Sequence, residues 1–186
     1  MDLKNKFETL VRENIKRDGI EDLLTAIAKT DFYTAPASTR FHDAEEGGLV
    51  RHSIRVYEVL LKENVPPNLN LLPHENTERL AVTALFHDFC KIGFYKVEMR
   101  NVKNETGKWV QVPYYTIDDL FPYGHGEKSV YMVQQFIKLT DEEAMAIRWH
   151  MNGFEAKENH IYIGKAYNMF PLALYLGVAD MKASYL

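Results

Sequence analysis

The segment LFHDFCKIG, residues 85–93, constrains the fold because it places His87 and Asp88 side by side within an apolar stretch. Burying an unpaired carboxylate costs several kcal/mol or forces its protonation, so folding must bring compensating groups to Asp88. Other polar residues interrupt apolar helical patterns elsewhere and are the candidates for this role. They are His52 in LVRHSIRV, His150 in AIRWHMNG, Asp180 in LGVADMKA, and His125 in YGHGEKS, where a helix is expected to begin.

Apolar residues recur at three- and four-residue spacing along most of the chain, which is typical of amphipathic helices. We expect helices at residues 3–15, 20–30, 49–64, 75–92, 124–139, 140–151 and 171–186. The segment at about 94–117 instead alternates, is rich in Val, Tyr and Trp, and contains the turn sequence KNETGK. It predicts a β-hairpin inserted between helices. The expected fold is an all-α helical bundle with a small β-hairpin insertion.

The chain shows no internal repeat or linker, so residues 1–186 are expected to form one domain, with N-terminal helices within about 1–30. The net charge of −4 argues against a protein that coats nucleic acid without specificity. Cys90, the single cysteine, leaves no disulfide partner within the chain, and no apolar run reaches the roughly 20 residues of a membrane span. We therefore expect a soluble, cytoplasmic protein with no membrane partner. No sequence pattern specifies its oligomeric state.

Imidazoles and carboxylates that converge inside a helical bundle are suitable ligands for a divalent metal ion. The charge of such an ion would compensate buried Asp88 and Asp180. Each histidine taken alone has a plainer interpretation, as a hydrogen-bonded core residue or a surface residue. The metal hypothesis therefore depends on the whole set.

The order His52, His87-Asp88, Asp180 resembles the HD superfamily of metal-dependent phosphohydrolases, and the likeness runs from about Pro36 to the C-terminus. The supporting motifs are EEGGLVRHS, LFHDFCKIG, GHGEKS, RWHM and YLGVADMKAS. Within the superfamily the chain is most similar to the HD module of bacterial 3′–5′ exoribonucleases, which follows an OB-fold domain. Here about 30 residues with a helical pattern stand in that place, so the exonuclease substrate does not transfer directly.

The resemblance implies hydrolysis of a phosphate ester, as a phosphodiesterase or phosphomonoesterase, on a nucleotide or short oligonucleotide. It also implies one or two divalent ions (Mn, Fe, Ni, Co, Zn or Mg). The residues expected to hold the first ion are His52, His87, Asp88 and Asp180; those expected to add a second ion beside Asp88 are His125 and His150. Asp88 and Lys91 are the expected catalytic residues, with Lys91 binding a substrate phosphate. The alternative for Lys91 is a surface lysine that suits a helix end.

A second His-Asp pair, His42-Asp43, lies in a polar loop and is not expected to bind the metal. Related exoribonucleases carry a histidine in this loop, so His42 could contact substrate.

Cys90 is expected to be a small buried residue. Two other functions stay open. One is a non-catalytic or regulatory HD module, in which the metal is structural and its site closed, or the site binds a nucleotide without cleaving it; the other is a di-iron oxygenase.

Overall fold

The computed structural model describes residues 2–64 and 73–186, and the side chains of all of these except 63–64 and 73–76. The helices are α1 (Leu3–Asn14), α2 (Ile20–Ile27), α3 (Gly48–Val59), α4 (Pro73–Phe86), α5 (His125–Gln134), α6 (Asp141–Trp149), α7 (His160–Met169) and α8 (Pro171–Tyr185). The two strands are β1 (Tyr95–Lys103) and β2 (Trp109–Ile117). Helices with one antiparallel hairpin agree with the expected fold class. Among the described residues, no helix is long and apolar enough to span a membrane.

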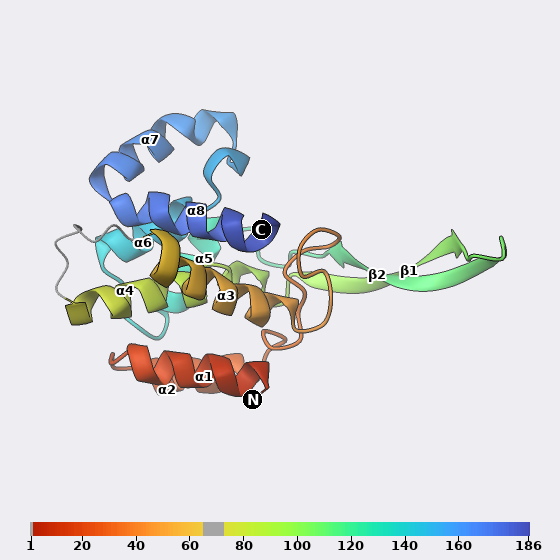
Figure 1. Cartoon of the computed structure of the whole chain (residues 1–186), viewed down its shortest axis with the longest axis horizontal. Coiled ribbons are helices and arrows are strands. Elements are labelled where there is room, and N and C mark those ends of the chain that lie inside the picture. Colours follow the sequence, from red (N-terminus) through yellow and green to blue (C-terminus); the bar gives the residue numbers. More distant parts are fainter. Residues whose placement is uncertain (1, 65–72) are drawn as a thin grey trace.

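Four helices form a closed ring of contacts at the centre of the molecule: α3 packs on α4, α4 on α6, α6 on α8, and α8 on α3. Helix α1 packs on the outer side of α3 and α4, opposite α8 (Figure 1). Buried apolar side chains of α1, α3, α4, α6 and α8 join into one hydrophobic cluster. Polar residues on the inner faces of the ring are consequently brought toward one another.

A buried ion pair links α6 to the segment between α1 and α2. Thr140 caps α6: its hydroxyl accepts the Glu143 N–H, and the Glu143 carboxylate accepts the Thr140 N–H. That carboxylate also lies 2.6 Å from the Arg17 guanidinium and is fully buried. One glutamate therefore both begins α6 and links it to the segment between α1 and α2.

The hairpin projects away from the helices (Figure 1). Its strands pair from Tyr95 opposite Ile117 to Lys103 opposite Trp109, so the expected insertion at about 94–117 is confirmed. At its base the Tyr95 hydroxyl donates to the carbonyl of Ala37, 3.0 Å away, and thereby joins the hairpin to the loop before α3.

The helices expected at 20–30 and 124–139 end earlier, at Ile27 and Gln134, and two further segments differ from expectation. The helix expected at 75–92 ends at Phe86, and the chain continues through a turn into a 3₁₀ helix, Phe89–Lys91. Helix α7 was not expected from the sequence, because HIYIGKAYNM carries a glycine and several β-branched or aromatic residues of low helix propensity.

Candidate metal centre

Six polar side chains from separate parts of the chain meet inside the helical ring. His52 lies in the middle of α3, and His87 and Asp88 occupy the turn that follows α4. Helix α5 begins at His125, and α6 ends just before His150. Asp180 completes the set from α8. The structure therefore brings together every residue that the sequence nominated as a metal ligand.

One half of the cluster contains both carboxylates. His52 Nε2 lies 2.9 Å from Asp180 Oδ1 and 3.6 Å from Asp88 Oδ2. His87 Nε2 lies 3.3 Å from Asp88 Oδ2 and 3.9 Å from Asp180 Oδ1. Two imidazole nitrogens and two carboxylate oxygens thus face a common point. Such a mixed nitrogen and oxygen set suits Zn²⁺, Mn²⁺, Fe²⁺, Co²⁺ or Ni²⁺.

The other half uses the second oxygen of the same aspartate. His125 Nε2 lies 3.0 Å and His150 Nε2 3.7 Å from Asp88 Oδ1. Gly126 allows this meeting, because a Cβ there would lie only 2.2 Å from the carbonyl oxygen of Arg148, so α5 and α6 could not approach as closely. Asp88 therefore directs one oxygen toward each half, as a bridging carboxylate would. The halves overlap, since His87, His150 and Asp180 also have ligand atoms within 4.8 Å of one another.

The imidazoles are oriented by the backbone at the helix ends. His87 Nδ1 lies 2.8 Å from the carbonyl oxygen of Ala84, and His150 Nδ1 lies 2.7 Å from that of Ile147. Assigned from these partners, Nδ1 carries the proton and donates, which leaves the Nε2 lone pair free for a metal. The Nε2 atoms of His87 and His150 are buried and have no hydrogen-bond partner among the described residues, and that of His52 faces only the carboxylates of Asp180 and Asp88. Buried nitrogens without partners are costly unless an ion binds them, so the cluster fits a divalent metal.

The charges of the cluster also favour the binding of a cation. Although burial raises the pKa of Asp88, Lys91 and His87 outweigh it and hold that pKa well below its usual value. Burial likewise raises the pKa of Asp180, but His52 and His87 produce a net decrease. Burial lowers the pKa of His87, yet the neighbouring carboxylates raise it further than burial lowers it. The two aspartates therefore stay ionised and attract cations.

Lys91 is placed by the 3₁₀ helix that replaces the expected end of α4. In this tighter turn residues i and i+3 lie almost above one another, so Lys91 reaches back over Asp88. Its Nζ lies 2.7 Å from Asp88 Oδ2, and its side chain is only 13% exposed. Lys91 is consequently a partner of the cluster rather than a surface lysine.

A cavity of about 300 Å³ opens onto the cluster. Its lining residues come from the loop before α3, the metal cluster, the segment after α6 and the end of α8. They are Phe41, His42, Asp88, Lys91, Met151, Phe154, Asp180, Met181, Ser184 and Tyr185. The aromatic residues at the rim of this cavity were not predicted from the sequence. Among them, Phe41 is 67% exposed and Phe154 is 66% exposed. Nothing in the local pattern distinguishes an aromatic at the edge of a cavity from one in the core.

The second His-Asp pair is divided between two environments. His42 lines the cavity, its ring centre 4.8 Å from that of His52, and burial together with nearby positive groups lowers its pKa to about 4. Asp43 instead forms ion pairs with Arg51 at 3.2 Å and Arg55 at 3.0 Å. The structure thus separates Asp43 from the cluster and leaves His42 where it can meet a ligand.

Cys90 is buried, as expected, although its sulfur lies 3.4 Å from His125 Nδ1. Burial and the neighbouring Asp88 raise the pKa of its thiol to about 12. A thiol with so high a pKa is a poor nucleophile at neutral pH. The chemistry of this site therefore rests on the imidazoles and carboxylates.

Comparison with known proteins gives one family. The sequence model of the HD domain matches residues 49–181, which include all six residues of the cluster. Searches of curated proteins and of solved structures give no significant match. HD domains bind divalent metals and are typically metal-dependent hydrolases. The chain belongs to the HD domain family, and its His and Asp cluster lies within the part that defines that family.

Proposed function

We propose that this protein is a metal-dependent phosphohydrolase that cleaves a phosphodiester or phosphomonoester in a nucleotide or oligonucleotide. The observation that carries the proposal is the convergence of three buried imidazole nitrogens on two ionised carboxylates beside an open cavity. We also propose that residues 1–186 form one HD-type domain, related through its motifs to the HD module of 3′–5′ exoribonucleases.

Each residue of the cluster has a proposed role. The first ion would be held by His52, His87, Asp88 Oδ2 and Asp180. A second ion would be held by His125, His150 and the other oxygen of Asp88; the backbone carbonyl of Ile147 orients the His150 ring so that Nε2 points inward.

A divalent ion in such a site activates water for attack and offsets the charge of the phosphoryl oxygens. Lys91 supports this chemistry with a fixed ammonium group at the wall of the cavity, where it stabilises Asp88 and faces an entering phosphate. The cavity, at about 300 Å³, is at the small end of ligand sites and suits one nucleotide unit rather than a large cofactor.

The test is hydrolysis of bis(p-nitrophenyl) phosphate and p-nitrophenyl phosphate by purified protein with Mn²⁺, Co²⁺, Ni²⁺, Mg²⁺ or Zn²⁺ added in turn. Asp88→Asn should lose both bound metal and turnover, because the amide keeps the shape but removes the charge that both halves share. The matched control is Asp43→Asn in the second His-Asp pair, which should retain its metal because Asp43 pairs with arginines.

Two outcomes would count against the proposal. An Asp88→Asn protein that keeps its metal and turnover would show that the cluster is not the active centre. Wild-type protein that binds metal but hydrolyses neither ester nor any nucleotide would favour the non-catalytic alternative.

A further inference from the structure

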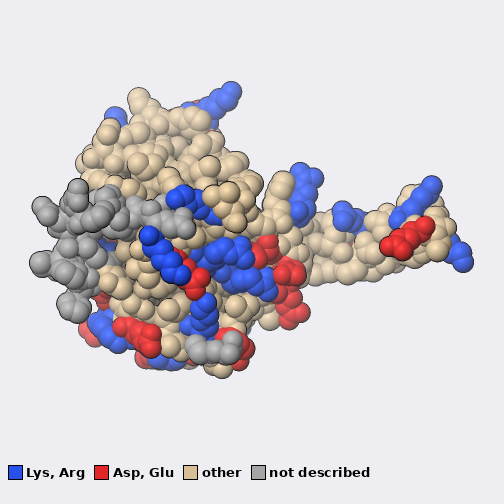
Figure 2. All heavy atoms as spheres, viewed as in Figure 1, with Lys and Arg blue, Asp and Glu red and all other residues tan. Residues whose placement is uncertain are grey.

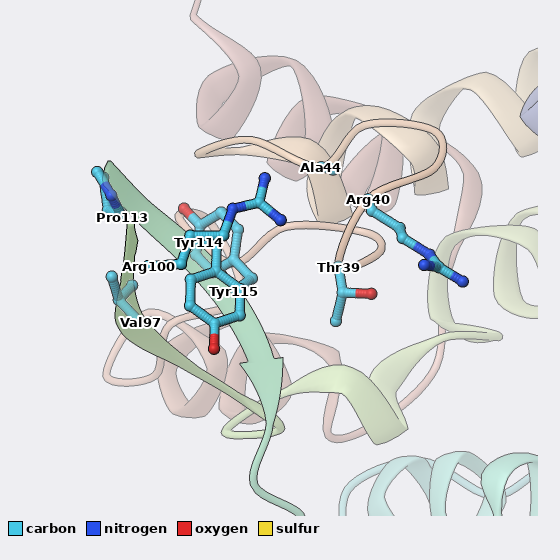
Figure 3. A pocket seen from close by; sticks show the side chains of 8 residues that line it. All are labelled: Thr39, Arg40, Ala44, Val97, Arg100, Pro113, Tyr114 and Tyr115. Atoms are coloured by element: carbon cyan, nitrogen blue, oxygen red, sulfur yellow. The ribbon is translucent and has the colours of Figure 1, made fainter. Parts of the chain in front are cut away.

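A second cavity, of about 370 Å³, lies between the base of the hairpin and the loop before α3. Figure 3 shows hairpin side chains on one side, including Arg100, Tyr114 and Tyr115, and the loop with Arg40 on the other. It does not contain any of the six residues of the metal cluster. The roles proposed for the cluster therefore leave this cavity unexplained.

Its two arginines are the exceptions among the arginines of the chain. Six others form ion pairs with Asp or Glu side chains: Arg12, Arg17, Arg51, Arg55, Arg79 and Arg148. Arg40 and Arg100 have no acidic partner among the described residues, and both are exposed. One guanidinium group on each side of the cavity is therefore without a carboxylate partner among the described residues, and each can meet a separate phosphate of a ligand.

Each of these guanidinium groups lies over an aromatic ring. Arg100 is 5.2 Å from the ring centre of Tyr114, and Arg40 is 5.0 Å from that of Phe41. Arginine binds phosphate through two parallel N–H groups, and aromatic rings stack on nucleobases. Alternating arginine and aromatic side chains therefore suit a ligand that alternates phosphates with bases.

The two cavities share one loop. Arg40 lines the hairpin cavity, while its neighbours in sequence, Phe41 and His42, line the cavity of the metal cluster. In Figure 3 the Arg40 side chain turns away from the hairpin, in keeping with its position over Phe41. A ligand that begins at Arg100 and passes Arg40 thus reaches the rim of the metal cavity.

We propose that the hairpin cavity binds a single-stranded oligonucleotide, with Arg40 and Arg100 on its phosphates and Tyr114 or Tyr115 against a base. The same strand then extends past Phe41 to the metal centre. This inference rests on the proposed function, of which it names the substrate class. It gives the hairpin the role of a binding arm, supplied from within the domain.

The charge of the hairpin agrees with such a ligand. Residues 95–117 contain four basic and two acidic side chains, whereas the whole chain has a net charge of −4. Figure 2 shows Lys and Arg side chains along the hairpin and at its tip, with acidic side chains near the tip and where the hairpin meets the body. The hairpin therefore carries a small net positive charge on a molecule whose total charge is negative.

The experiment measures binding of a fluorescein-labelled single strand of about ten nucleotides, DNA and RNA in turn, by fluorescence anisotropy in EDTA so that no hydrolysis occurs. The Arg40→Ala/Arg100→Ala double variant should bind about tenfold or more weakly, since two charge-assisted contacts are removed. The slope of log affinity against log salt concentration should also become shallower by about 1.4, because each lost phosphate contact removes about 0.7 from it.

The matched control is Lys103→Ala/Lys108→Ala, which also removes two positive charges, both from the hairpin outside the cavity. Its affinity should change by less than about twofold, because long-range charge alone is screened by salt. Thermal unfolding verifies that all variants fold.

Three results would overturn the inference: no binding by wild type, equal losses in both double variants, or equally tight binding of a duplex of the same length. If wild type hydrolyses bis(p-nitrophenyl) phosphate but binds no strand, only this inference fails. If it binds the strand through both arginines but hydrolyses no ester with any metal, the proposed function fails and the binding site stands.

Discussion

Replacing Lys91 by methionine tests what compensates the buried charge of Asp88. The substitution keeps most of the apolar stem and removes the ammonium group that lies 2.7 Å from Asp88 Oδ2. Without a divalent ion, the variant must fold around a carboxylate whose side chain is only 3% exposed. We therefore expect Lys91→Met to be strongly destabilised in EDTA and much less so when a divalent ion is bound.

The expected loss of stability of Lys91→Met follows from the distance between the two charges. At 2.7 Å and an effective dielectric constant of about 20, the attraction between the two charges is about 6 kcal/mol before desolvation is counted. Breaking a buried ion pair by removing one partner costs about 3–5 kcal/mol, and some exposure of Lys91 favours the lower end. For a chain of this length each kcal/mol lowers Tm by about 2–4 °C, so we expect a loss of roughly 6–12 °C.

The assay is thermal unfolding of wild type and Lys91→Met in EDTA and in saturating Mn²⁺. A bound dication supplies the charge that Lys91 no longer gives, so Mn²⁺ should raise Tm more in the variant than in wild type. The matched control is Arg17→Met, which leaves the fully buried Glu143 without its cation far from the cluster, on the first turn of α6. Its loss of stability should be the same with and without Mn²⁺.

Two results would refute this reasoning. An equal loss of Tm for Lys91→Met in EDTA and in Mn²⁺ would show that the ion does not compensate Asp88. No loss in EDTA would show that the pair between Lys91 and Asp88 contributes nothing to folding.

Three further outcomes are expected. Lys91→Met should lower turnover of bis(p-nitrophenyl) phosphate while its Mn²⁺ content at saturation, by elemental analysis, equals that of wild type; loss of metal would contradict a role toward phosphate. Wild type saturated with Mn²⁺ should contain two equivalents and His150→Ala one, whereas one equivalent in both would exclude the second ion. Thr140→Ala should cost about 1 kcal/mol through loss of the α6 cap, seen as a Tm about 2–4 °C lower with unchanged metal content; an unchanged Tm would contradict the capping role.

Local patterns predicted the parts of this fold that depend on local interactions. The hairpin was located to within a residue or two, because its alternation and the turn around Asn104 and Gly107 are properties of the segment itself. The convergence of His52, His87 and Asp180 was also predictable. Each interrupts an apolar helical face, and such faces must turn inward in a bundle.

Features that depend on tertiary packing were not visible in the sequence. The end of α4 at Phe86 is an example: the Cys90 N–H donates to the Ser129 hydroxyl of α5 instead of continuing the helix, and no local pattern reports that partner. The pairing state of arginines is another example. Arg40 and Arg51 look alike in sequence, yet only the folded chain shows that Arg51 meets carboxylates and Arg40 does not.

The charge of the cluster suggests an order in which its two halves fill. Asp88 and Asp180 together balance one dication, and Lys91 then leaves the cavity with an excess of positive charge that suits an anionic phosphate. The half near His125 and His150 contributes only the second oxygen of Asp88, so an ion there adds charge without adding a carboxylate. A phosphate that enters the cavity offsets this excess, and the second ion should therefore bind more tightly with substrate than before it. The buried aspartate in LFHDFCKIG is thus compensated by Lys91 and imidazoles in the folded chain, and its two oxygens make it the residue on which both proposed ions depend.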